Sequence, residues 1–457
     1  MRFKTSFLIT FAFHLMILVL DKGTGLIISK MFSAKDQVAT RGDLVLLTNL
    51  PFILMAISNL GLATSLVYFA QRKEVTVRVA GETTSFVATA WGSFVSLAAV
   101  GVIAVWATTD STADFPPLAL LVPLLLTPIF LLLISYRNSI QLVLHKIYAY
   151  NVTQLIPSVV FLPLFLLLYF VITDRDPHES AVWAICIPAI FVALGLSWIL
   201  RKHVPLRPRF HRGFLRKALA YGWRANVSST LGYLNHRVDL YLLPLVYMVS
   251  VNDARAEVAF YSMAVTLAEL IWHFPEALRD LMFAKVASLD EDAARAFTPV
   301  VCRNSLWICA AGAAVVWVVH DPLLGLWFAD DWGAVWGPKV TPALAWLLPG
   351  TLLFTVAKVL RADLMARGFV NQCIFLAGLV LVVMIAGDIA LVPQLGATGA
   401  SLASTIAYGA CAIGTVWFYA SRTGVPVLKL LIPHREDWQH YRTLLARLRI
   451  LRNPSED

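Results

Sequence analysis

The chain carries little charge for its length. Charged residues make up only 14% of its 457 residues, whereas hydrophobic residues make up 59%. Soluble domains contain about 25% charged residues because their surfaces face water. The low charge therefore excludes a soluble globular protein, and the high hydrophobicity excludes a disordered chain. A chain of this composition places most of its surface in lipid.

Cysteine is also scarce, and so are the motifs of enzymes. The five cysteines include no CxxC pair and lie in hydrophobic stretches, at Cys186, Cys302, Cys309, Cys373 and Cys411. Neither a disulfide framework nor a zinc site is predicted from such a pattern. The sequence contains no Walker loop, GxSxG or HExxH. We therefore expect no enzyme activity, no cofactor and no metal.

Hydrophobic stretches of about 20 residues, the length of a membrane-spanning helix, recur along the whole chain. They predict an all-α polytopic membrane protein with about twelve transmembrane helices. The predicted spans are 5–30, 43–70, 80–107, 115–136, 152–173, 180–200, 214–249, 255–286, 298–319, 341–362, 369–391 and 398–420. The two spans between 214 and 286 are the least apolar.

The basic residues indicate how these helices cross the membrane. Most of the 37 basic residues lie in the segments that share a side with the N-terminus, chiefly the loop 201–217 and the C-terminal tail. The other side receives only Lys30, Lys35, Arg41, Arg175, Arg255 and Lys339. Basic loops stay in the cytoplasm, which predicts a multi-pass membrane protein with both termini cytoplasmic. The net charge of +9 then reflects topology and not nucleic-acid binding.

The basic loop divides the chain into two sets of six helices. A shift of 217 residues aligns Gly42 with Ala259 and Glu179 with Gly396, at the starts of corresponding helices. This predicts two pseudo-repeated six-helix bundles around a central cavity, although any twelve-span chain can show such matches by chance. The predicted lobes are residues 1–205 and 206–425. The tail, 426–457, reads either as an amphipathic helix on the membrane surface or as a solvated charged segment.

Four ionisable residues lie on one face of the eighth span. Glu269, His273, Glu276 and Asp280 are spaced by four, three and four residues, which matches the helical period. Ionisable groups are costly in the bilayer. We therefore expect this stripe to face a water-filled cavity or charged partners.

Basic residues in the neighbouring spans are candidate partners. Helix geometry places Glu269 at the depth of Arg237, and it places Glu276 and Asp280 nearer Arg224. These charges either form structural ion pairs or line a functional cavity. The 217-residue shift also superimposes Lys22 on Asp239, so that the two could meet across the cavity. Alternatively, Asp21 and Lys22 neutralise each other.

Several short motifs near these residues resemble a known family. They are Asn59-Leu-Gly61-Leu-Ala-Thr-Ser65, Tyr221-Gly222, Leu234-Asn-His-Arg237-Val-Asp239, Phe260-Tyr261-Ser-Met-Ala264, Phe274-Pro275-Glu276-Ala277-Leu278 and Gly396-Ala-Thr-Gly399-Ala400-Ser-Leu-Ala403. The chain is similar to the polysaccharide-export branch of the multidrug/oligosaccharidyl-lipid/polysaccharide (MOP) exporter superfamily. These proteins are flippases of undecaprenyl-linked repeat units.

The resemblance implies two six-helix bundles in a V around a cationic cavity. The implied substrate is an undecaprenyl-pyrophosphate-linked oligosaccharide, which is moved by alternating access. Glycosyltransferases would supply this substrate, and a polysaccharide polymerase would use it. Lys22, Arg224 and Arg237 match the buried cations expected for the pyrophosphate. Asn59, Asn226, Asn235, Glu269 and His273 could supply donors and acceptors for the glycan hydroxyls, and Asp239 is a further candidate substrate-binding residue. The resemblance also implies a place in the bacterial inner membrane. The lipid II flippases of the superfamily carry two additional helices, which this chain lacks.

A cation-coupled multidrug antiporter of the same superfamily is the alternative, and it would favour acidic, apolar-lined pockets. A second open question is energy coupling by H⁺ or Na⁺. Glu269 and His273 lie one helical turn apart, so they are candidates for a proton-coupled step, with Asp21, Glu276 and Asp280 as further groups of the cavity. Alternatively, Glu269 is the permanent counter-ion of Arg237. The sequence does not identify the glycan.

Overall fold

A computed structural model describes residues 3–109, 118–205, 207–247, 250–276, 286 and 290–432. All regular structure in these ranges is helical. The first half of the chain forms α1 (Phe3–Met31), α2 (Val38–Ser58), α3 (Leu62–Gln71), α4 (Val77–Thr109), α5 (Leu118–Val143), α6 (Ile147–Leu167), the π-helical turn η1 (Leu168–Ile172) and α7 (Pro177–Ile199).

The second half follows the same plan with more interruptions. It forms α8 (Arg212–Leu234), α9 (Val238–Val246), α10 (Val251–Ala268), the 3₁₀ turn η2 (Glu269–Trp272), α12 (Glu291–Phe328), the π-helical turn η3 (Trp332–Trp336), α13 (Gly337–Ala366), α14 (Val370–Leu395), α15 (Ala397–Thr423) and the short α16 (Val427–Leu431). The predicted tail beyond residue 432 and the predicted site residue Asp280 lie outside the described residues.

The predicted polytopic all-α fold is confirmed. Ten helices in the described ranges are long and apolar enough to cross a membrane, and α8–α9 and α10–η2 supply two more polar passages. Two predicted spans are broken in the middle. The span 43–70 is interrupted at Asn59–Gly61, and the span 214–249 is interrupted at Asn235–Arg237. Hydropathy did not reveal these breaks because the flanking segments are apolar on both sides.

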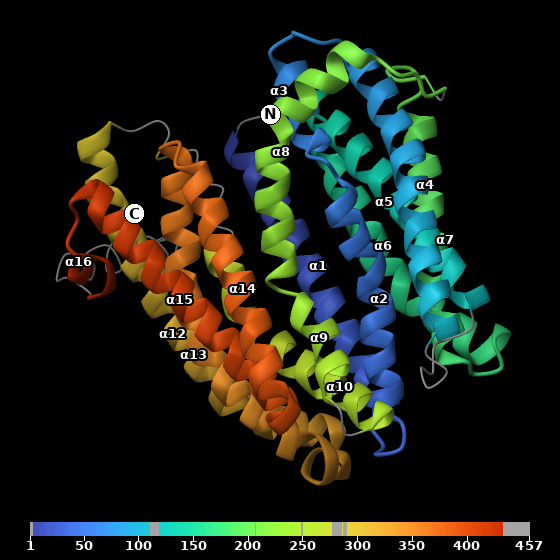
Figure 1. Ribbon diagram of the computed structural model, residues 1–457, viewed down its shortest axis with the longest axis vertical. Helices are drawn as coiled ribbons and strands as arrows, with labels where there is room; N and C mark the ends of the chain where they lie inside the picture. The colour runs from blue at the N-terminus through green and yellow to red at the C-terminus, as the bar shows by residue number, and fades with distance from the viewer. Residues whose placement is uncertain are drawn as a thin grey trace, which may run out of the picture.

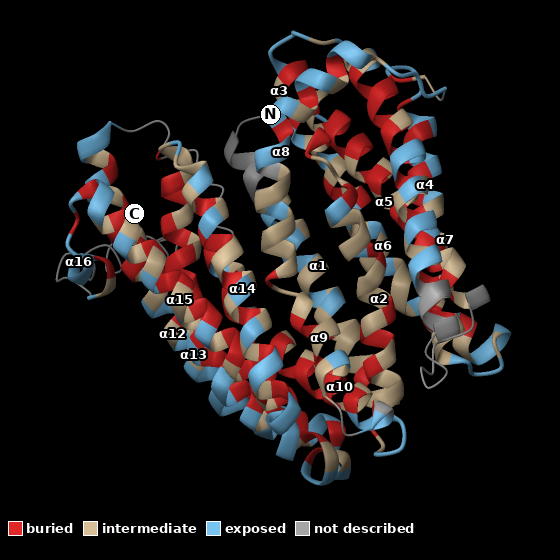
Figure 2. Ribbon diagram, in the orientation of Figure 1, coloured by how far each residue is buried: buried red, intermediate tan, exposed pale blue. Residues whose placement is uncertain are grey.

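The two halves form separate bundles that lean together in a V (Figure 1). They meet at the end that carries the loops 32–37 and 329–331, which we name the closed end. They diverge at the end that carries the start of α1 and the loop 200–211, which we name the open end. Buried residues follow the interior of each bundle, whereas α1 and α8 are largely half-buried or exposed between the bundles (Figure 2).

Contacts between the bundles are dense at the closed end. The Arg255 guanidinium lies 3.2 Å from the Asp43 carboxylate, and the Tyr241 hydroxyl donates to the Leu46 carbonyl at 2.7 Å. Gly42 packs so tightly against the carbonyl of Arg255 that no side chain would fit there. These contacts join α2 to α9 and α10, and they hold the closed end shut.

At the open end, α8 packs on the N-terminal bundle. Gly61, in the left-handed region at φ 71°, meets Gly222 of α8 backbone to backbone. The Ser65 hydroxyl donates to the Ala218 carbonyl at 2.7 Å, and the Tyr221 ring stacks on that of Tyr68 with centroids 4.1 Å apart. The family-like motifs Asn59–Ser65 and Tyr221–Gly222 therefore pack against each other where α8 crosses α3.

This crossing predicts opposite effects for two glycines of α8. A methyl group at Gly222 would overlap the Gly61 carbonyl and the Ser65 hydroxyl, whereas one at Gly232 meets nothing within 4 Å. We expect Gly222→Ala to destabilise the protein by about 1–3 kcal/mol through overpacking. Gly232→Ala should leave stability unchanged or raise it, because alanine favours the helix. Thermal unfolding of the purified protein measures both, and equal melting temperatures would contradict the crossing.

Candidate functional site

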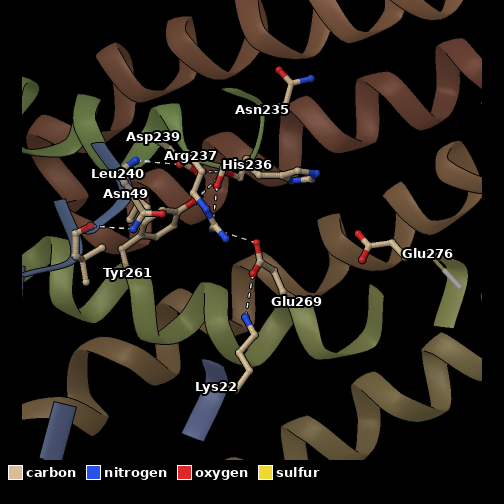
Figure 3. Close-up of polar contacts among 12 residues, drawn as sticks. Lys22, Asn49, Asn235, His236, Arg237, Asp239, Leu240, Tyr261, Glu269 and Glu276 are labelled. Atoms are coloured by element: carbon tan, nitrogen blue, oxygen red, sulfur yellow. Dashed lines mark hydrogen bonds and ion pairs between the residues drawn. The ribbon is translucent and has the colours of Figure 1, made fainter. Parts of the chain in front are cut away.

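The centre of the molecule is a cluster of three charges. The Lys22 ammonium lies 3.1 Å from one oxygen of Glu269, and the Arg237 guanidinium lies 3.2 Å from the other (Figure 3). The exposed fraction of the side chain is 23% for Lys22, 27% for Arg237 and 16% for Glu269. Because Lys22 belongs to α1 and the other two to the C-terminal bundle, the cluster links the bundles at mid-depth.

Both C-terminal members of the cluster lie where a helix is interrupted. Arg237 is the last residue of the break between α8 and α9, with φ −138° and ψ −15°, and Glu269 opens the 3₁₀ turn that follows α10. Irregular backbone inside a membrane protein is tolerated where it lines a polar site. The predicted pairing of Glu269 with Arg237 is present, and Lys22 is an additional partner.

The second predicted pairing is wrong. Glu276 does not lie with Arg224: its carboxylate is 2.6 Å from the ammonium of Lys358 in α13, and His273 lies 4.0 Å away on its other side. Arg224 is exposed and rests beside the ring of its neighbour Trp223. The prediction failed because it considered only the two neighbouring spans, whereas α13 also packs against η2.

The predicted meeting of Lys22 and Asp239 is wrong as well. Asp239 is only 2% exposed and lies inside the C-terminal bundle. Its carboxylate accepts hydrogen bonds from the Tyr261 hydroxyl, from Ser404 at 3.2 Å and from the Leu240 amide at 2.9 Å. The first turn of α9 and two hydroxyl groups thus solvate this carboxylate, and Lys22 instead reaches the more accessible Glu269.

The two predicted asparagines stabilise helix breaks. Asn235, 1% exposed, donates to the Ala377 carbonyl at 3.0 Å, and its own carbonyl accepts from Tyr408. The Asn59 carbonyl accepts from Tyr136 at 2.9 Å. Asn235 was predicted to contact a glycan and Asp239 to bind the substrate, but their burial leaves neither accessible to a substrate in this conformation. Asp21 is exposed on α1.

Several polar residues near the centre were missed by the sequence reasoning. Lys358 and Arg361 lie inside α13 but were not singled out as candidates. Away from the centre, Arg41 lies inside α2, where it donates to Ser29 at 2.8 Å. Asp388 of α14 is fully buried, and neither of its carboxylate oxygens has a hydrogen-bond partner among the described residues. A lone acid in an otherwise apolar span was the signal that could have identified it.

A small cavity lies between the charge cluster and Asp239. Its lining residues are His236, Asp239, Tyr261, Val265, Ala268, Glu269, Trp272, Leu347, Thr351 and Tyr408. It has room for about one water molecule. The ring of Trp272 forms one wall, 4.8 Å from His236 and 5.6 Å from Tyr408. The cavity joins the accessible carboxylate of Glu269 to the interior of the C-terminal bundle.

The cluster predicts energetic coupling between the bundles. Glu269→Gln leaves Lys22 and Arg237 without their counter-ion, and we expect a cost of about 1–2 kcal/mol because these side chains are partly exposed. The substitution Lys22→Met should lower the free energy of unfolding by less in the Glu269→Gln background than in the wild type. A double-mutant cycle of thermal unfolding measures this difference. Arg224→Met, which breaks no ion pair, is the control. Strictly additive effects would contradict the coupling.

Comparisons with known proteins show the fold. No protein-family model and no curated protein matches the sequence. Among solved structures, an inward-facing MATE-family multidrug resistance transporter of the MOP superfamily matches with a TM-score of 0.71 at 14% identity, over 92% of this chain and 98% of the other. The lipid II flippase MurJ, in an inward closed conformation, matches with a TM-score of 0.70 at 14% identity, over 92% and 89%.

An outward-facing MATE-family transporter also matches, with a TM-score of 0.66 at 14% identity, over 92% of this chain and 96% of the other. Identity this low establishes likeness of fold alone. These neighbours are transporters and a flippase. The chain therefore has the helical membrane fold that MATE multidrug transporters and the flippase MurJ of the MOP superfamily share.

Proposed function

We propose that the chain is a flippase of the polysaccharide-export type, which moves an undecaprenyl-pyrophosphate-linked oligosaccharide across the bacterial inner membrane. The observation that carries the proposal is the Lys22–Glu269–Arg237 cluster, in which two cations from different bundles share one carboxylate between them. A pyrophosphate is an anion that must cross hydrocarbon. Lysine and arginine side chains at mid-depth supply charge-assisted hydrogen bonds that offset its desolvation.

Glu269 explains how binding could drive movement. In the absence of substrate it holds both cations in place. A pyrophosphate that binds Lys22 and Arg237 competes with Glu269, and it thereby replaces the one mid-depth ion pair that joins α1 to the C-terminal bundle in the described part of the chain. A ligand shifts a conformational equilibrium only through such differences in contacts between states. Anion binding and bundle separation are thus coupled at one carboxylate.

The surroundings of Trp272 favour an anionic substrate over a cationic drug. An aromatic face is the surface that attracts an organic cation, but here the Lys358 ammonium occupies it, 3.8 Å from the ring centroid. Lys22, Arg237 and Lys358 also outnumber Glu269 and Glu276 around this centre. A further cation would be repelled. The antiporter of the same superfamily remains the second candidate, and the buried acids Asp239 and Asp388 are what favour it.

The arrangement of the bundles supports loading from the cytoplasm. The open end carries the basic loop that includes Arg201, Lys202 and Arg207, and basic loops are cytoplasmic. The contacts of α2 with α9 and α10 close the other end. A lipid-linked glycan made by cytoplasmic glycosyltransferases would bind from the open end, keep its polyprenyl tail in lipid and leave toward a polymerase outside.

For energy coupling, the contacts of Glu269 favour the counter-ion alternative, since two cations already engage it. Asp388 is the better candidate for a coupling group. It is fully buried, and neither of its carboxylate oxygens has a hydrogen-bond partner in the described ranges. A buried carboxylate without a partner is costly, so a proton or a sodium ion from outside would stabilise it.

Export of surface polysaccharide tests the substrate assignment. Arg237→Ala should abolish export without lowering the amount of protein in the membrane. Arg237→Lys should restore part of it, because lysine keeps the charge but loses the forked geometry. Arg175→Ala, in an exposed loop at the closed end, is the control and should export normally. Full export by the Lys22→Ala/Arg237→Ala double variant would refute the proposal.

Transport in proteoliposomes under an imposed pH or sodium gradient tests the coupling group. We expect the Asp388→Asn variant to transport substrate down its gradient but to lose the response to the ion gradient. An amide does not take up a proton and has no negative charge to hold a sodium ion. Glu269→Gln should keep the response. If Asp388→Asn responds as the wild type does, Asp388 is not the coupling site. If only Glu269→Gln loses the response, Glu269 is the coupling group, as first predicted from its spacing with His273.

A further inference from the structure

A second cation is held at the centre by a different carboxylate. The Lys358 ammonium lies 2.6 Å from Glu276 and 3.8 Å from the centroid of the Trp272 ring. The Lys358 side chain is only 11% exposed, whereas that of Glu276 is 42% exposed. The ammonium is therefore fixed against the protein, and the carboxylate covers it from the solvent side.

This pair lies apart from the Lys22–Glu269–Arg237 cluster. Glu276 follows Glu269 by seven residues, which corresponds to about 10 Å along a helix, and it lies toward the open end because α10 starts at the closed end. A single pyrophosphate is too short to reach both positions. If Lys358 binds an anion, it binds either the pyrophosphate at an earlier position or another acidic group of the same substrate.

A neighbouring arginine adds a second donor. Arg361 lies one turn beyond Lys358 on α13, so the two share a helix face. Its Nε atom is buried and has no hydrogen-bond partner in the described part of the chain. Its guanidinium also donates to the Cys373 carbonyl of α14 at 3.4 Å. Lys358 thus lies against the aromatic wall with Glu276 between it and the solvent, and Arg361 lies one helical turn away.

We propose that Lys358, with Arg361 one helical turn away, is the core of a second anion-binding subsite on the open-end side of the Lys22–Arg237 cluster. Glu276 occupies this subsite until a substrate anion replaces it. The ligand is a phosphate or carboxylate group of the lipid-linked glycan, so the proposal rests on the proposed function. Displacing Glu276 is inexpensive because water can solvate this exposed carboxylate. Leaving Lys358 without an anion is costly because the ring and its burial keep water away.

The chain contains a matched control for this pair. Lys339 of α13 lies 2.6 Å from Glu257 of α10, with the same separation in sequence and distance as Lys358 and Glu276. This second pair lies toward the closed end, and Glu257 also accepts from the Ala397 amide at 2.7 Å. Substitutions in a purely structural ion pair should leave the ligand affinity unchanged at both places, whereas Lys358 and Glu276 should change it if Glu276 competes with the ligand.

The test is calorimetric binding of farnesyl diphosphate, which carries no sugar, to the purified full chain. Lys358→Met should weaken binding about tenfold, as expected for loss of a charge-assisted contact, and Lys358→Arg should restore it. Glu276→Gln should tighten binding several-fold because it removes the competitor. Lys339→Met and Glu257→Gln should leave the affinity unchanged.

The outcomes separate the two proposals. If Lys358→Met does not change farnesyl diphosphate binding but abolishes calorimetric binding of glucuronate, the subsite takes an acidic sugar. If neither ligand responds, or if Glu276→Gln weakens binding and lowers the melting temperature as Lys358→Met does, the pair is structural and the inference fails. Arg237→Ala would still weaken binding in that case, and the proposed function would stand. No binding by the wild type would instead refute the proposed function.

Discussion

A carboxylate inside a membrane protein needs cations, and the position of Glu269 decides which ones it finds. Lys22 comes from the first helix of the chain, and Arg237 comes from a break that follows two hundred residues later. The two cations cannot approach each other unless the acid lies between them. The charge balance at this point therefore fixes how α1, α9 and η2 meet, and it also provides the place where an external anion could intervene.

The helix breaks are part of the same arrangement. In a continuous helix from 212 to 246, the directions of the Arg237 and Asp239 side chains would be fixed relative to each other by the helical period. The break at Asn235–Arg237 instead lets Arg237 reach Glu269 while Asp239 is bonded to Tyr261 and Ser404 in the interior. The break at Asn59–Gly61 lets α3 approach Gly222 of α8. Polar partners for the freed backbone groups, such as Tyr136 and Tyr408, make both breaks tolerable in lipid.

The acids in the C-terminal bundle divide into two kinds. Glu269 and Glu276 each hold cations from another helix and are partly accessible, which suits exchange with a substrate anion. Asp239 and Asp388 are buried, which suits a proton or a small cation. One acid of each kind, Glu269 and Asp239, lines the same small cavity, so the two kinds of acid meet at this point.

The sequence by itself determined the all-helical membrane fold, because apolar length and the distribution of basic residues depend on the bilayer and not on tertiary contacts. It also identified Glu269 and Arg237 as partners, since two ionisable residues at one depth in adjacent spans have few alternatives. Tertiary structure alone decided the partners of Lys22, Glu276 and Lys358. These residues come from segments far apart in the chain, and which helices pack together depends on close contacts, such as that of Gly61 with Gly222, that no periodicity encodes.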